Sequence, residues 1–162
     1  MATKLSDNIN DVIDLDISVT RKKRFRFDRD DNRLVDLNIA DMNIMSRLAE
    51  TYPKLLDFLE EVKSISDMPV DENTEDTTTA ITQMQAIGDK LKEIDTKMRT
   101  SLDYIFNAPV SAAASPDGSM YDIFEGQFRF EYILDLLLSY YENNLTTEFA
   151  KLKKHTAKYT KK

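Results

Sequence analysis

The spacing of apolar residues changes along residues 12–53, and this change constrains the fold more than any other feature of the chain. In the first part of this stretch apolar and polar residues alternate, which is typical of half-buried strands. Three such rows are Ile13–Val19, Lys23–Phe27 and Val35–Ile39. The polar cluster Asp28–Asn32 separates the last two rows and has the composition of a turn. The sequence therefore predicts a β-hairpin, or a small three-stranded antiparallel sheet, within residues 12–40.

A helical period follows the alternating rows. Apolar residues then recur every three or four positions, at Met42, Met45, Leu48, Ala49 and Tyr52. This spacing predicts a helix over residues 41–66, with Asp41 as its N-cap and Asn38 as the competing cap. Pro53 either kinks this helix or lies in the first turn of a second one.

A long helix is predicted over residues 79–107. Its apolar positions form one narrow stripe at Ile81, Met84, Ile87, Leu91, Ile94, Met98, Leu102 and Ile105. A stripe of this kind cannot bury itself, so the helix needs a long antiparallel partner in the same chain or in another subunit. The acidic stretch 67–78 before it reads as a linker, and residues 108–119, with two prolines and a glycine, read as a loop.

The last predicted helical region is 120–160. Its wide apolar face consists of Ile123, Phe124, Phe128, Tyr132, Ile133, Leu134, Leu137, Leu138 and Tyr141. The helical phase continues through Asn143–Asn144, where the sequence leaves open one long helix or two. One long helix would extend beyond a compact domain and expose a candidate partner-binding surface, formed by Leu145, Phe149, Leu152 and Tyr159.

These elements define one domain over residues 12–162, preceded by a polar N-terminus, 1–11, that we expect to be flexible. The predicted fold class is mainly α with a small β part, in which the hairpin or small sheet packs on a bundle of long helices. The long stripe of residues 79–107 leaves a homo-oligomer possible in principle.

The composition argues against most catalytic and metal-binding chemistry. The chain has no cysteine and a single histidine, His155, and its three glycines form no phosphate loop. We therefore expect no catalytic residues, no cofactor and no bound metal. The chain has no apolar run of about 18 residues and no apolar segment near its start, so we expect neither a membrane span nor a secretory signal.

The turn Asp28–Asn32 copies the start of a calcium-binding EF-hand loop, with Asp28, Asp30 and Asn32 at the first three ligand positions. The match ends there, because Arg33 stands where that loop needs glycine and Ile39 stands where it needs glutamate. We interpret the segment as an acidic turn without calcium.

Two basic segments stand out in an acidic chain of net charge −7. The first interleaves candidate nucleic-acid contacts Arg21, Lys22, Arg24 and Arg26 with two phenylalanines, a pattern that can stack bases. The second is the terminus 151–162, which holds six of the 22 basic residues and no acid, leaving 16 basic against 29 acidic residues in the rest. We prefer a buried aromatic row with a cationic outer face, and a solvated helix end, over nucleic-acid binding.

Three motifs resemble small proteins encoded in the tail-morphogenesis gene clusters of long-tailed phages and prophages of Gram-positive bacteria. The motifs are KRFRFDRDDNRLVDLN, DMNIMSRL followed by TYPKL, and the C-terminal HTAKYTKK. Some proteins of this kind look like tail assembly chaperones, which hold tail tube or tape-measure subunits before these polymerise.

The resemblance implies a non-catalytic protein that acts in the cytoplasm of the host bacterium and binds tail tube or tape-measure subunits. It implies no catalytic residues. One alternative is a structural component of the virion or its tail. A further alternative is a nucleic-acid-binding regulator that uses Arg21–Arg26 and the basic terminus.

Overall fold

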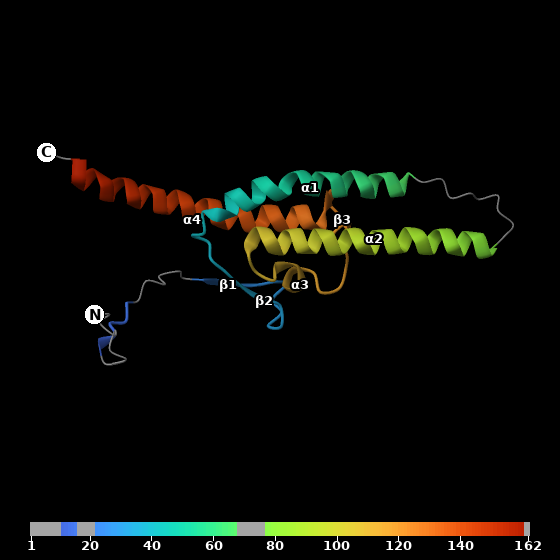
Figure 1. The fold of residues 1–162 in the computed structure, drawn as a ribbon, viewed down its shortest axis with the longest axis horizontal. Coiled ribbons are helices and arrows are strands. Elements are labelled where there is room, and N and C mark those ends of the chain that lie inside the picture. The colour runs from blue at the N-terminus through green and yellow to red at the C-terminus, as the bar shows by residue number, and fades with distance from the viewer. Residues whose placement is uncertain (1–10, 16–21, 68–76, 161–162) are drawn as a thin grey trace, which may run out of the picture.

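The computed structural model describes residues 11–15, 22–67 and 77–160, and Figure 1 shows long packed helices with small hairpins beside them. The helices are α1 (Asn43–Ser66), α2 (Thr77–Phe106), the short α3 (Val110–Ala114) and α4 (Arg129–Thr160). The strands are β1 (Lys23–Arg26), β2 (Leu34–Leu37), β3 (Ile123–Phe124) and β4 (Gln127–Phe128). The predicted class, mainly α with an N-terminal hairpin packed on long helices, is confirmed.

The N-terminal hairpin forms where the alternating rows predict it. β1 and β2 pair antiparallel, with Phe25 opposite Val35. The side chain of Asp30 accepts a hydrogen bond from the backbone N–H of Asn32 at 2.9 Å, which is the local bond that makes Asp common in turns. Asp28 and Arg29 both have positive φ, 53° and 58°, and their conformation reverses the chain.

The predicted row Ile13–Val19 is not part of this sheet in the described chain. Residues 12–15 have no regular structure, and the apolar side chains of Val12, Ile13 and Leu15 are exposed. Residues 16–21, the rest of the row, lie outside the described residues. The described sheet therefore has two strands, because a period of two shows which residues could share a face but not whether a neighbouring strand is present.

α1 is one helix that continues through Pro53, so the alternative of two helices is wrong. The N-cap is Met42 and not the predicted Asp41, although the Asp41 carboxylate accepts the backbone N–H of Asn43, the first helical residue, at 2.9 Å. The apolar residues that recur at helical spacing in the sequence are mostly not the ones that pack in the core. The core-facing residues are Ile44, Thr51, Leu55 and Ile65, whereas Met42, Met45 and Tyr52 are exposed.

α2 begins two residues before the predicted start and lies antiparallel to α1 (Figure 1), which supplies the expected partner within the chain. Its stripe is buried only in the second half, at Ile94, Met98, Leu102 and Ile105. In the first half Ile81 and Met84 remain 58% and 63% exposed. The core therefore lies toward the C-terminal end of α2.

The region 108–119, predicted as a loop, contains the short helix α3, whose Val110 is buried. Asp103 of α2 holds this helix, since its carboxylate accepts both the backbone N–H and the hydroxyl of Ser111, at 2.7 and 2.9 Å. Arg99 donates to the carbonyl oxygen of Ser115 at 2.8 Å and also to that of Gly118. These bonds fix the whole connection on one side of α2.

The last helix begins at Arg129, not near Met120 as the apolar spacing predicts. Residues 123–128 form the second hairpin, with Ile123 and Phe124 exposed. Its turn is Glu125–Gly126, in which both residues have positive φ, as the type I′ hairpin turn requires. α4 then runs without a break through Asn143–Asn144, which decides the open question in favour of one helix.

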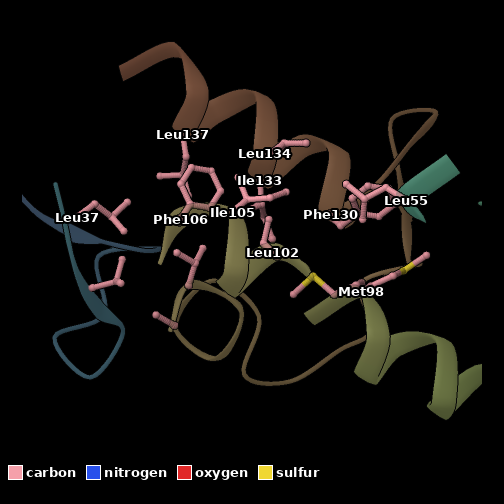
Figure 2. Close-up of a cluster of buried hydrophobic side chains, with 14 of the residues drawn as sticks. Leu37, Leu55, Met98, Leu102, Ile105, Phe106, Phe130, Ile133, Leu134 and Leu137 are labelled. Atoms are coloured by element: carbon pink, nitrogen blue, oxygen red, sulfur yellow. The ribbon is translucent and has the colours of Figure 1, made fainter. Parts of the chain in front are cut away.

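Figure 2 shows the core that joins these elements. Side chains of α4 face those of α2, while Leu37 of β2 and Leu55 of α1 lie at its two sides. The α4 and α2 members that the figure labels are Phe130, Ile133, Leu134, Leu137, Met98, Leu102, Ile105 and Phe106, all of them buried. The hairpin and α1 are therefore held at opposite ends of this core, near Leu137 and Phe130 of α4 respectively.

Candidate functional site

The C-terminal turns of α4 extend beyond the other helices (Figure 1), and we call the part from Leu145 onward the overhang. Phe149 and Leu152 are 49% and 53% exposed, and Leu145 is partly buried. The spacing of these three residues puts them on one side of the helix. Tyr159, the fourth predicted surface residue, lies in α4, but its side chain is outside the described residues.

A groove of about 530 Å³ lies between the overhang and the connection from β2 to α1, and we call it the α4 groove. The overhang contributes Leu145, Phe149 and Leu152, which the sequence analysis grouped as a binding surface. The remaining lining residues are Lys23, Ile39, Ala40, Met42, Asn144 and Glu148. The structure therefore brings three of the four predicted residues together and adds a second wall opposite them.

Hydrogen bonds hold the two walls of the groove in place. Asn144 of α4 donates from Nδ2 to the carbonyl oxygen of Ile39 at 3.2 Å. Arg47 of α1 donates to the carboxylate of Asp41 at 2.6 Å and to the carbonyl oxygen of Ile105 at 2.9 Å. The β2–α1 connection is thereby bonded to both α2 and α4, so the wall formed by Ile39 and Met42 has a fixed position.

Charged groups border the apolar lining of the groove. Glu148 lies in the groove and forms an ion pair with Lys151 at 3.2 Å. Lys23 of β1 lies in the opposite wall. Lys153 is exposed and follows Phe149 by four residues, which puts it on the same side of the helix. The groove thus offers apolar contact at its centre and lysines at its rim.

Sequence reasoning missed the second wall of the groove. Ile39 was assigned to a strand row and Met42 to the apolar spacing of the following helix, so neither was considered as a lining residue of a groove. Their common position depends on how the β2–α1 connection meets α4, and no local pattern encodes that long-range contact. The helical stripe of the overhang was the only usable signal.

The cationic hairpin residues are engaged with neighbouring acids. Arg24 binds the carboxylate of Asp36 through two nitrogens, at 2.8 and 3.1 Å, and this hydrogen bonding lowers the pKa of Asp36. Arg26 pairs with Asp31 at 2.8 Å. Lys22 is exposed, and Arg21 lies outside the described residues.

The aromatic row of the hairpin faces the helices rather than a nucleic acid. Phe25 is partly buried and contacts Tyr140 of α4 edge-on, with ring centroids 5.1 Å apart. Phe27 likewise packs against the core. A stacking platform needs exposed aromatic faces, so the geometry favours the packing interpretation of this row.

A second cavity, of about 520 Å³, lies beside the hairpin turn and is lined by Arg26, Arg33 and Arg129 among others. Arg33 donates to the carbonyl oxygens of Ala113 and Ala114. Arg129 donates to the hydroxyl of Ser115 at 2.8 Å. Because these cations already bind groups of the protein itself, we assign this cavity a structural role.

Within the ranges that the structure describes, no cluster of three or more acidic, histidine or cysteine residues could hold a metal ion. None of the described helices has a stretch long and apolar enough to span a bilayer. The comparisons of this chain with protein families, with curated proteins and with solved structures gave no match. The α4 groove is therefore the feature on which a functional interpretation rests.

Proposed function

We propose that this protein is a non-catalytic chaperone of the phage tail-assembly type, which binds a tail tube or tape-measure subunit through the α4 groove in the cytoplasm of the host bacterium. The proposal is supported by the resemblance over residues 21–55 and by one structural observation. The apolar side chains of the overhang, Leu145, Phe149 and Leu152, line an open groove instead of entering the core.

The physical reason for a binding role is the cost of this exposure. Burying a large apolar side chain contributes about 1.5–3 kcal/mol, so a partner that covers Phe149 and Leu152 recovers free energy that folding alone leaves unused. The rigid second wall means that little ordering is needed on this side of the complex. A groove of this form suits the retention of an aggregation-prone subunit until it polymerises.

The test is co-expression with the products of the neighbouring tail genes, followed by affinity purification. We expect a soluble complex with a tube or tape-measure subunit, and we expect Phe149→Glu to abolish its recovery. Met84→Glu is the matched control, because Met84 is also an exposed apolar residue on a helix but lies outside the groove. If no neighbouring product is recovered with the wild-type chain, the proposal is wrong.

Mass spectrometry of purified particles separates the chaperone from a structural component. A chaperone is expected in the lysate complex and absent from particles. Its presence in particles at a stoichiometry comparable to other tail proteins would instead establish a virion component that uses the same groove.

A further inference from the structure

α1 carries a second apolar stripe on a side that does not enter the core. It consists of Met42, Met45, Ala49, Tyr52 and Leu56, and all five residues are exposed. Met45 and Tyr52 are 60% and 52% exposed. The steps between members alternate three and four, which is the pattern by which two helices pair. At 1.5 Å per residue the stripe is about 21 Å long.

This stripe and the α4 groove form one continuous surface, because Met42 belongs to both. Met42 lines the groove together with Phe149 and Leu152. Met45 lies one helical turn further along α1 and leads to Tyr52 and Leu56. Large exposed apolar surfaces mark interaction sites, so a surface with two such halves calls for a partner that covers both.

The two halves differ in charge. From Phe130 to Glu148, α4 carries four acidic residues and no basic one, whereas residues 151–162 carry six lysines and no acid. Beside the α1 stripe, two exposed acidic residues, Asp57 and Glu60, are balanced by two exposed lysines, Lys54 and Lys63, so the acidic excess comes from α4. The chain is therefore acidic along α4 within the bundle, balanced beside the α1 stripe, and basic from Lys151 onward.

We propose that two copies of this chain form a twofold symmetric dimer in which each overhang packs on the α1 stripe of the other copy. A twofold interface needs a surface that is complementary to itself after a half-turn. Such a rotation about an axis near Met42 places the basic overhang of each copy along the helix bundle of its partner, in which α4 carries the acidic excess. A parallel arrangement would instead place two basic overhangs side by side, and the repulsion between their lysines opposes this arrangement.

The dimer goes beyond the proposed client binding. Phe149 and Leu152 would contact the partner copy, so the dimer covers the α4 groove in the absence of a client. A client must then displace the second copy. Dimerisation needs no client and is measured on the purified protein alone. A chain that does not dimerise therefore leaves the proposed client binding standing, and a chain that binds no client leaves the proposed dimer standing.

The first experiment is sedimentation equilibrium of the full chain from micromolar to near-millimolar concentration. We expect a monomer–dimer equilibrium that weakens as salt increases, because opposite charges meet across the interface. Phe149→Glu and Tyr52→Glu should each raise the dissociation constant at least about tenfold. Met84→Glu, which alters an exposed apolar residue of α2, should leave it unchanged. A wild-type chain that stays monomeric throughout would overturn the inference.

A mixing experiment tests the geometry. Each variant alone damages both contacts of a twofold dimer. A mixed dimer of Phe149→Glu with Tyr52→Glu keeps one intact contact, between the unaltered overhang of one copy and the unaltered α1 of the other. The mixture should therefore associate more tightly than either variant alone, which also shows that both variants are folded. No gain on mixing would exclude the overhang-on-α1 arrangement.

Discussion

The side-chain amide of Asn144 donates a hydrogen bond to the carbonyl oxygen of Ile39, with Nδ2 and O 3.2 Å apart. The two residues are 105 positions apart in the sequence and both line the α4 groove. The bond joins α4, at the turn just before the overhang, to the connection that follows β2. It therefore fixes the direction in which the overhang leaves the bundle relative to the opposite wall.

Replacing Asn144 with alanine removes this bond and leaves the carbonyl of Ile39 without its α4 partner. We expect Asn144→Ala to lower the free energy of unfolding by about 0.5–1.5 kcal/mol, the usual net value of one hydrogen bond. Urea denaturation measures the change. Asn143→Ala is the control, because Asn143 is exposed and outside the groove. Equal effects of the two substitutions would show that the bond contributes nothing specific.

The α2 stripe offers a second test, because its two halves have different environments. Met98 is fully buried, whereas Ile81 is 58% exposed. Met98→Ala should cost about 2–5 kcal/mol of stability through lost burial and a cavity. Ile81→Ala should change it by less than about 0.5 kcal/mol, as is usual at the surface. Chemical denaturation of both variants checks this, and similar losses would mean that the first half of α2 is buried in solution.

Local patterns were sufficient to predict the hairpin and the three long helices. Phe25 and Val35 belong to two alternating rows, and the acidic segment between these rows has the composition of a turn. The pairing of the two strands therefore followed from local spacing alone. The α2 stripe likewise identified Ile94 to Ile105 as buried. It could not show that Ile81 is exposed, because periodicity gives the side of a helix that is apolar but not how far its partner extends.

Two shortcomings of the sequence analysis had a common cause, which is that several packings fit the same apolar spacing. α1 has apolar residues on two sides, and the spacing of Met45 and Tyr52 identified the helix but not the side that the fold buries, which is that of Ile44 and Leu55. Phe124 and Phe128 fit a helical face as well as a hairpin. Gly126 between them was the usable signal for a turn, and it was read as part of a helix.

The candidate site was predictable only in part for a similar reason. The stripe of Phe149 and Leu152 is local and was found, whereas Lys23, Ile39 and Met42 reach the groove through tertiary contacts. Those contacts arise when the hairpin and the start of α1 both pack on α4, and the spacing of residues within one element carries no record of them.

Pro53 lies inside α1 at an exposed position. A helix-interior proline lacks the backbone N–H and lowers stability by about 3 kcal/mol relative to alanine. Its replacement also raises the conformational entropy of the unfolded chain, which offsets about 0.4–1 kcal/mol of that gain. Pro53→Ala should therefore stabilise the protein by about 2–2.6 kcal/mol, measured by thermal or urea denaturation. Lys54→Ala, at the next exposed position, should change stability little, and a destabilised Pro53→Ala variant would contradict the argument.

Tyr141 should make the protein less stable in alkali. Its side chain is buried against Phe106, with ring centroids 5.7 Å apart, and burial raises the pKa of its phenol from 10.0 to about 12. Between about pH 10 and pH 12 the phenol of Tyr141 ionises in the unfolded chain but stays protonated in the folded one. Its contribution to the free energy of unfolding is therefore complete below about pH 10 and falls by about 2–3 kcal/mol as the pH rises to about 12. Urea denaturation across this range measures the slope.

Tyr141→Phe removes the ionisable hydroxyl and should reduce that alkaline slope while keeping the ring contact with Phe106. Tyr140→Phe is the matched control, because Tyr140 is the adjacent tyrosine of α4 and is exposed. The control should keep the wild-type slope. If Tyr141→Phe kept the full loss of stability above about pH 10, the burial of this phenol would not be its cause, and the packing of α4 on α2 at Phe106 would be looser than the structure indicates.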